Sequence, residues 1–205
     1  VRPTVEGERA KTPVADVDED GNEVAGIRLP EVAAPFATFA GWNVRHPETG
    51  KYVCWLKIME RDGRQRSTVL VADALLGPYA IVRTGLRPLG MNAGDFDLVI
   101  DPSDGKGYYY FERVHSELIC ADLPDALTDV TGYYSTHFPQ PGPPLVREAP
   151  AYFRRGWKHY LITSGTSWYF PNQSEVAIAD RYHGPFTVLG DPHVNDPSAT
   201  SFGSQ

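Results

Sequence analysis

The sequence predicts an all-β protein, specifically a β-propeller built from four-stranded blades. A glycine turn followed by an aromatic strand occurs three times, and each time a second strand ending in Ala-Asp comes after it. Glycine and proline account for 19 and 18 of the 205 residues, which favours many turns between short elements. The chain has 11 tyrosines and 2 methionines, and aromatic residues favour strands. These units show no helical period.

Each repeat unit supplies its strands in the same order. The glycine turns lie at Gly50, Gly105 and Gly156, before the strands KYVCWLKI, KGYYYFER and WKHYLITS. The Ala-Asp strands are TVLVAD, ELICAD and EVAIAD. A Gly-Pro-aromatic strand follows at Gly77 and at Gly184, whereas the middle unit has DVTGYYS instead. The strands DFDLVID and REAPAYF precede the second and third turns, and WNVRH is a poor candidate for the matching strand of the first unit.

The spacing of the units favours a propeller over a β-sandwich. The turns are 55 residues apart from 50 to 105 and 51 apart from 105 to 156, slightly longer than the roughly 40–45 residues of a WD-type blade. Strands also alternate in a sandwich, but a sandwich gives no reason for four strands to recur in one order. Because propellers close with about four to eight blades, residues 46–205 are expected to form an incomplete arc of about three blades.

Residues 1–45 do not follow the repeat and are predicted to form a hairpin and then an irregular segment. Asp20-Gly21 favours a hairpin turn between VADV and NEVAGI. The run from Asp16 to Gly21 also resembles a calcium loop, but its twelfth position, which should be a bidentate Glu, is Ile27. Residues 28–44 are interrupted by proline, and they resemble a stretch of large bacterial α/β-hydrolase-like proteins without any catalytic motif.

Composition and charge exclude several function classes. The formal net charge of −7 disfavours a surface for nucleic acid or for an anionic membrane. No stretch approaches the roughly 18 apolar residues of a membrane span, and the chain opens VRPTVEGERAK, without the apolar region of a signal peptide. Cys54 and Cys120 lie in apolar strands and are expected to be buried free thiols, although export would allow a disulfide. We expect no metal ligands and no cofactor.

Three polar residues recur at blade spacing. Asp95, Glu148 and Gln205 are separated by 53 residues (95 to 148) and 57 residues (148 to 205). In a propeller the first strand of each blade lines the central channel, so these side chains would converge there. A glycosidase needs one carboxylic acid to protonate the leaving oxygen and another group to handle water on the opposite face of the sugar. The alternative is that Asp95 and Glu148 cap strands or pair with bases such as Arg147.

Four further residues are candidates for binding a sugar. Trp168 and Tyr169 lie beside Phe170 in the loop SGTSWYFPN, where exposed rings can stack on sugar faces, and Asn172 can bind a hydroxyl. In the alternative interpretation one or two of these rings pack between blades. His137 lies in the Pro-rich segment YYSTHFPQPGPP, which either overhangs the channel or leaves the imidazole in solvent.

Two shorter segments are also ambiguous. Glu112 and His115 in FERVHSEL are expected in a hairpin connection, although Glu112 could project inward. The run from Asp101 to Gly105 looks like a metal loop, yet Asp-Gly before a strand is usual turn chemistry.

Residues 46–205 resemble glycoside hydrolase family 43, the five-bladed propeller glycosidases that act with inversion, and most closely the branch that contains exo-β-1,3-galactanases. The matching segments are KYVCWLKI, VADALLGPYAIV, DFDLVIDPSDGKGYYY, EAPAYFRRGWKHYLITSGTSWYFPN and SFGSQ. The resemblance implies that Glu148 is the general acid and that Asp95 tunes and orients it. It implies that Gln205 holds the attacking water, and it suggests a secreted or periplasmic enzyme.

The chain departs from the family pattern in two places. No first blade precedes the matched region, and in most branches that blade carries the general-base Asp. A sugar-contacting Glu precedes the KYV strand in this branch, whereas here the run from Ala40 to Pro47 places Trp42 or Asn43 near that position. We therefore expect inverting, exo-acting hydrolysis of a β-linked galactan or a related plant-type polysaccharide, with a non-catalytic carbohydrate-binding or truncated, inactive propeller fragment as the alternative.

Overall fold

The computed structural model describes residues 37–168, 170–193 and 195–197, and these residues form three four-stranded antiparallel sheets. Blade 1 contains β1 (Ala37–Arg45), β2 (Tyr52–Met59), β3 (Gln65–Ala72) and β4 (Ala80–Leu86). Blade 2 contains β5 (Ala93–Ile100), β6 (Gly107–Arg113), β7 (Glu117–Asp122) and β8 (Tyr134–His137). Blade 3 contains β9 (Arg147–Arg155), β10 (Lys158–Gly165), β11 (Glu175–Ala179) and β12 (Thr187–Gly190). A short 3-10 turn, Pro88–Gly90, joins the first two blades.

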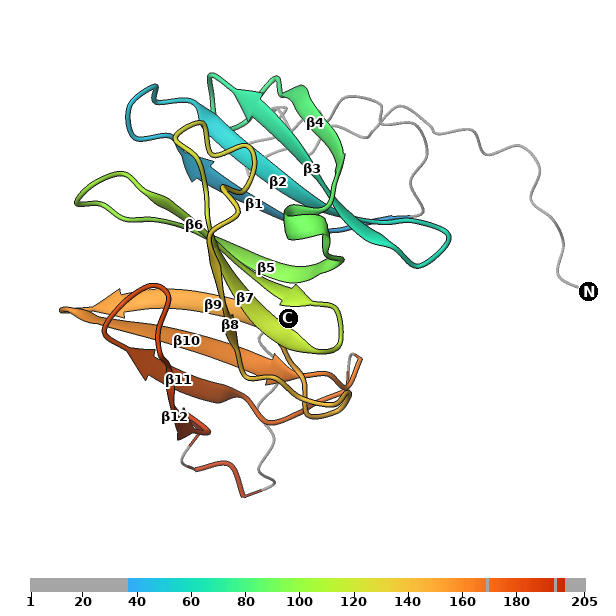
Figure 1. Cartoon of the computed structure of the whole chain (residues 1–205), viewed down its shortest axis with the longest axis vertical. Helices are drawn as coiled ribbons and strands as arrows, with labels where there is room; N and C mark the ends of the chain where they lie inside the picture. Colours follow the sequence, from blue (N-terminus) through green and yellow to red (C-terminus); the bar gives the residue numbers. More distant parts are fainter. Residues whose placement is uncertain (1–36, 169, 194, 198–205) are drawn as a thin grey trace, which may run out of the picture.

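Within each blade the strands lie side by side in chain order, and the blades are stacked with blade 2 in the middle (Figure 1). Strand β5 packs against both β1 and β9, so the first strands of the three blades are neighbours. The repeat therefore predicts the architecture correctly, and the described residues form an incomplete propeller. No helix among these residues is both long enough and apolar enough to cross a bilayer.

Strand β1 corrects the prediction of an irregular segment over residues 28–44. Residues 37–45 form a strand that pairs with β2, with Trp42 opposite Trp55 and Val44 opposite Val53, and its register shifts once, between Thr38 and Ala40. The prolines that suggested irregular structure lie at positions 30 and 35, before the strand begins. Pairing with the strongly apolar β2 then decides the conformation of a sequence with little strand preference of its own. The hairpin predicted at Asp20-Gly21 lies outside the described residues.

The central strand β6 explains how blade 2 packs against both neighbours. Successive side chains of a strand point to opposite faces of the sheet. Tyr109 and Phe111 accordingly join the core cluster shared with blade 1, whereas Tyr110 joins the cluster shared with Leu161 of blade 3. The Tyr110 hydroxyl donates a hydrogen bond to the carbonyl oxygen of Tyr182 at 2.6 Å. The aromatic run of this strand is buried because both of its faces are covered.

Trp55 connects blades 1 and 2. Its side chain is fully buried, its ring centroid lies 4.7 Å from that of Tyr109, and its indole nitrogen donates to the carbonyl oxygen of Leu127 at 2.9 Å. Cys54 and Cys120 are buried and free, as predicted. The Asp101 carboxylate accepts hydrogen bonds from the amide and the hydroxyl of Ser103, which confirms a turn at this position.

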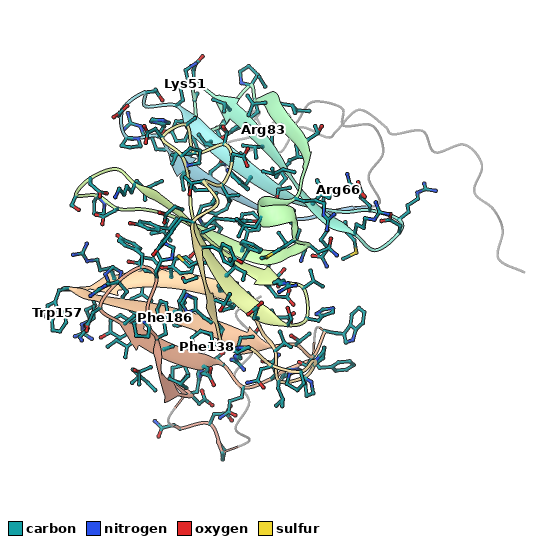
Figure 2. The ribbon with its side chains drawn as sticks, in the orientation of Figure 1. Lys51, Arg66, Arg83, Phe138, Trp157 and Phe186 are labelled. Atoms are coloured by element: carbon teal, nitrogen blue, oxygen red, sulfur yellow. The ribbon has the colours of Figure 1, made fainter. Side chains whose placement is uncertain are left out.

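We expect Trp55→Ala to lower the free energy of unfolding by roughly 3–5 kcal/mol, because it removes a fully buried aromatic side chain and a buried hydrogen bond. Chemical denaturation followed by circular dichroism measures the change. The matched control is Trp157→Ala, at an exposed side chain that lies at the edge of the molecule (Figure 2), where a change within about 0.5 kcal/mol is expected. Equal losses in the two variants would contradict the assigned role of Trp55.

Candidate active site

Glu148 lies near the start of β9, where the backbone is irregular. Ala149 has a φ of 47°, which is uncommon for a residue other than glycine. The register between β9 and β10 shifts between Ile162 and Ser164, and Ser164 is the residue opposite Glu148. A bulge of this kind redirects a side chain that would otherwise follow the regular alternation of the strand. The Glu148 side chain is buried, with 6% of its surface exposed.

Asp95 on β5 forms an ion pair across the junction of blades 1 and 2. The ammonium of Lys57 on β2 lies 2.5 Å from the carboxylate of Asp95. The lysine side chain is 11% exposed and that of Asp95 is 25% exposed, so the pair is largely shielded from water. Asp95 therefore lies close enough to Glu148 to raise its pKa, and it is paired with a cation of the neighbouring blade.

Glu112 on β6 is a second buried carboxylate beside Glu148. It is 2% exposed, and it accepts a hydrogen bond from the backbone amide of His115 at 2.6 Å. The Nδ1 atom of His115 lies 3.2 Å from the same oxygen. A Cβ atom at Gly94 would lie 2.1 Å from the other carboxylate oxygen, so Glu112 can occupy this place only because residue 94 has no side chain. Glu112 thus projects inward from a strand.

Burial and neighbouring carboxylates raise the pKa of Glu148 to about 7. Loss of hydration is the largest cause, and repulsion from Glu112 and then from Asp95 adds to it. A hydrogen bond with Thr166 and the charge of Lys57 oppose the increase. Burial also raises the pKa of Glu112. One buried carboxyl is therefore half protonated near neutral pH, which suits proton donation.

The same groups also form a set of potential metal ligands. Glu112, His115 and Glu148 each offer one ligand atom, and these three atoms lie within 4.8 Å of one another. Among the described residues, this is the group of three such side chains that lies so close together. Two carboxylate oxygens and one imidazole nitrogen are ligand atoms that can bind a divalent cation.

In the loop after β10, one of the predicted sugar-binding side chains is exposed and another forms hydrogen bonds within the loop. Trp168 is 81% exposed and has a φ of 55°. The Asn172 amide instead organises the loop: it accepts from the Gly165 amide at 2.8 Å and donates to the Gly165 carbonyl at 2.8 Å and to the Ser167 hydroxyl at 2.7 Å. Tyr169 lies outside the described residues, as does Gln205. The binding roles of these residues stay predictions.

His137 lies away from the carboxylates. It ends β8, the outermost strand of blade 2, whereas Asp95 lies on β5 at the inner edge of the same sheet. The imidazole is buried rather than solvated, and burial, followed by the charge of His183, lowers its pKa to about 4. His137 lines a separate cavity between blades 2 and 3, and none of Asp95, Glu112 and Glu148 lines that cavity.

Sequence reasoning left two site residues without a role, Lys57 and Glu112. Strand alternation contains the signal for both. Lys57 continues the alternate positions of Val53 and Trp55, which face blade 2. Glu112 continues the face of Tyr110, which is directed at blade 3. A charged residue in line with a buried face indicates a buried partner of opposite charge or a functional site.

Solved structures similar to this chain include family 43 β-1,3-galactosidases and exo-β-1,3-galactanases. A family 43 β-1,3-galactosidase solved with galactodeoxynojirimycin is 25% identical, with a TM-score of 0.65 over 74% of this chain and 57% of its own. The exo-β-1,3-galactanase of Phanerochaete chrysosporium with β-1,3-galactotriose is 21% identical (TM-score 0.66; 74% and 35% covered). That of Clostridium thermocellum is 23% identical (TM-score 0.65; 73% and 34% covered). The resemblance to glycoside hydrolase family 43 is confirmed.

Over about three quarters of its length the chain is similar to family 43 enzymes of the galactanase-like branch, and it spans between about a third and 57% of the length of these enzymes. A family model described as an α/β hydrolase domain matches residues 2–60, a range that includes residues 28–44, where the sequence resembles such proteins. The last part of that range forms β1 and β2 of blade 1. No curated protein matches the chain. The predicted boundary at residue 45 stays a prediction.

Glu148→Gln is expected to stabilise the protein at pH 8 and to change its stability little at pH 4. The pKa of Glu148 is raised from 4.5 to about 7, so the folded protein holds this proton more tightly than the unfolded chain does. Stability from this group is complete below about 4.5 and is lost as the pH rises through 7. Gln stays neutral throughout, which gives a gain of about 3 kcal/mol at pH 8.

Thermal or chemical unfolding at the two pH values measures this gain. Glu48→Gln, at an exposed carboxylate, is the control and should show no such pH-dependent difference. A Glu148→Gln effect of the same size at pH 4 and pH 8 would show that the pKa of Glu148 is not raised.

Proposed function

We propose that this glycoside hydrolase-like protein catalyses inverting, exo-acting hydrolysis of a β-linked galactan or a related plant-type polysaccharide. The observation that carries the proposal is the buried carboxyl of Glu148, with its pKa near 7, at the inner edge of the blades beside Asp95 and Glu112. The solved neighbours supply the substrate class, because they act on β-1,3-galactans or are bound to galactose derivatives.

In the proposed mechanism Glu148 acts as the general acid. Its protonated form donates to the glycosidic oxygen as the bond to the anomeric carbon breaks, and a water attacks that carbon from the opposite face. The charges of Glu112 and Asp95 disfavour the ionised form of Glu148, which keeps the acid loaded at neutral pH. Lys57 restrains Asp95 through the ion pair and limits how far the pKa of Glu148 rises.

The water-activating group is proposed to be Gln205. Its amide would hold the attacking water, and an unusual tautomer would be needed for it to act as a base. Trp168, Tyr169 and Asn172 are proposed to contact the sugar, with Asn172 acting mainly through the shape of the loop that it holds. A bound oligosaccharide would be the protein's partner.

Glu148→Gln is expected to lower kcat on a β-1,3-galacto-oligosaccharide or an aryl β-galactoside by about 10²–10⁴-fold, because positioned proton transfer contributes a factor of that size. KM should change less than kcat, since Gln keeps the shape of the side chain. Release of reducing sugar measures the rate. The control is again Glu48→Gln, which should retain wild-type activity, and full activity of Glu148→Gln would remove Glu148 from the mechanism.

The pH dependence of kcat/KM should report the ionisation of Glu148. Activity is expected to fall as the pH rises above about 7, because the acid loses its proton there. Glu112→Gln removes a repelling carboxylate and should move this decline to lower pH. Lys57→Met removes a charge that favours the ionised form and should move it to higher pH. Shifts in the same direction in the two variants would contradict the assigned electrostatics.

A second candidate function is sugar binding without turnover. The family resemblance places Trp42 or Asn43 near the position of the sugar-contacting Glu, so that carboxylate is missing from the proposed site, and the Asn43 side-chain oxygen accepts a hydrogen bond from Tyr79 at 3.2 Å. Calorimetric titration with galacto-oligosaccharides, run beside the reducing-sugar assay, separates the two functions. Heat of binding without product favours the binding module, and product favours the enzyme.

A further inference from the structure

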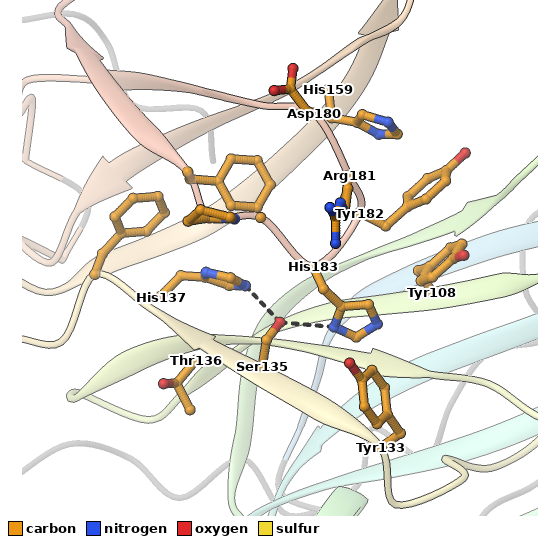
Figure 3. Close-up of a pocket in the computed structure, with 14 residues that line it drawn as sticks. Tyr108, Tyr133, Ser135, Thr136, His137, His159, Asp180, Arg181, Tyr182 and His183 are labelled. Atoms are coloured by element: carbon orange, nitrogen blue, oxygen red, sulfur yellow. Dashed lines mark hydrogen bonds between the residues drawn. The ribbon is translucent and has the colours of Figure 1, made fainter.

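A chain of four hydrogen-bonding side chains lies between the outer strands of blades 2 and 3. The hydroxyl of Ser135 on β8 lies 2.8 Å from Nδ1 of His183, in the loop between β11 and β12. The Nε2 atom of His183 lies 2.6 Å from the carboxylate of Asp122, at the end of β7. On its other side the same hydroxyl lies 2.9 Å from Nε2 of His137. Figure 3 shows the Ser135 hydroxyl between the two imidazoles.

The carboxylate determines the direction of every bond in this chain. A carboxylate only accepts, so in the neutral form of His183 the proton resides on Nε2 and Nδ1 offers a lone pair. The Ser135 hydroxyl must then donate its proton to Nδ1. Its oxygen consequently accepts from Nε2–H of His137, whose imidazole is neutral because burial keeps its pKa low. The Ser135 hydroxyl thus donates its proton to a base, His183, and the Asp122 carboxylate orients that base.

The hydroxyl opens into a cavity large enough for a small organic molecule. Ser135, His137 and His183 line a space of about 790 Å³. Its walls include five aromatic side chains, namely Tyr108, Tyr133, Phe138, Tyr182 and Phe186. Figure 2 places Phe138 and Phe186 at the junction of blades 2 and 3. Arg181 also lines the cavity and supplies a positive charge. Aromatic walls with a few convergent polar groups favour an aromatic ligand over a purely hydrophilic one.

We propose that Ser135, His183 and Asp122 form a second hydrolytic site, in which Ser135 is the nucleophile toward carboxylic esters that carry an aromatic group. A nucleophile with its base within hydrogen-bond reach, and a third group that orients the base, are the features of a serine esterase site on any fold. This site lies on the outer strands, apart from the carboxylates at the inner edge of the blades.

The reaction balances with the groups present and one water. The Ser135 oxygen attacks the ester carbonyl and its proton moves to Nδ1 of His183. The C–O bond to the alcohol then breaks, and the alcohol leaves with that proton. Water attacks the acyl carbon and gives its proton to His183, and the Ser135 oxygen leaves and recovers a proton. His137 and Arg181 line the same cavity, and in the proposed reaction they are the donors assigned to the negative charge on the carbonyl oxygen.

Covalent labelling of the full chain with a fluorophosphonate tests the proposal directly. Such a probe forms an O–P bond with an activated serine and expels fluoride. We expect one label per chain, located on Ser135 by peptide mass spectrometry, and hydrolysis of a 4-nitrophenyl ester that the label abolishes. Ser135→Ala and Asp122→Asn should each lower the rate of that hydrolysis by at least about 100-fold. His183→Gln is also expected to abolish labelling of Ser135 at every pH tested.

The matched control is Ser116→Ala, which removes a hydroxyl from the turn between β6 and β7 of the same blade. It should label and hydrolyse as the wild type does. Circular dichroism and thermal unfolding verify that each variant is folded. Asp122→Asn keeps the size of the side chain, so it tests the proposal if Ser135→Ala does not fold. Labelling elsewhere, absence of labelling, or unchanged ester hydrolysis in Ser135→Ala would overturn the proposal.

Discussion

Packing between neighbouring blades holds this structure together, because each four-stranded sheet can bury its faces only against the next sheet. Blade 2 bears most of this constraint, since the side chains of β6 alternate between the core of blade 1 and the core of blade 3. The same alternation carries Glu112 toward blade 3, and on β2 it carries Lys57 toward blade 2. The charged groups of the site therefore extend the two faces that form the cores.

The repeat made most of this architecture predictable from the sequence, because each glycine turn and each Ala-Asp strand occupies one place in a blade. Glu148 and Asp95 were found by blade spacing, and the structure brings both to the inner edge. β1 escaped prediction because it depends on its pairing with β2. Lys57 and Glu112 could not be assigned a partner, since the residues they meet come from another blade and only packing brings them together.

His137 shows a further limit of sequence reasoning. Its Pro-rich surroundings suggested a loop near the channel, yet four residues of that segment form the outermost strand of blade 2. A β-strand this short has no recognisable period, so its place in the sheet is decided by pairing with β7. The imidazole therefore neither overhangs the channel nor lies in solvent, but is buried beside Ser135 at the outer strands of blades 2 and 3.

Gly94 links the backbone of β5 to the electrostatics of Glu148. A Cβ atom there would overlap the Glu112 carboxylate, so even alanine would force that carboxylate to move. Glu112 is also held by the His115 amide, and its freedom to retreat is small. The absence of a side chain at residue 94 therefore leaves the Glu112 carboxylate its place beside Glu148. Substitutions at residue 94 should therefore change the pKa of Glu148 as strongly as substitutions of the neighbouring ionisable residues do, although glycine has no functional group of its own.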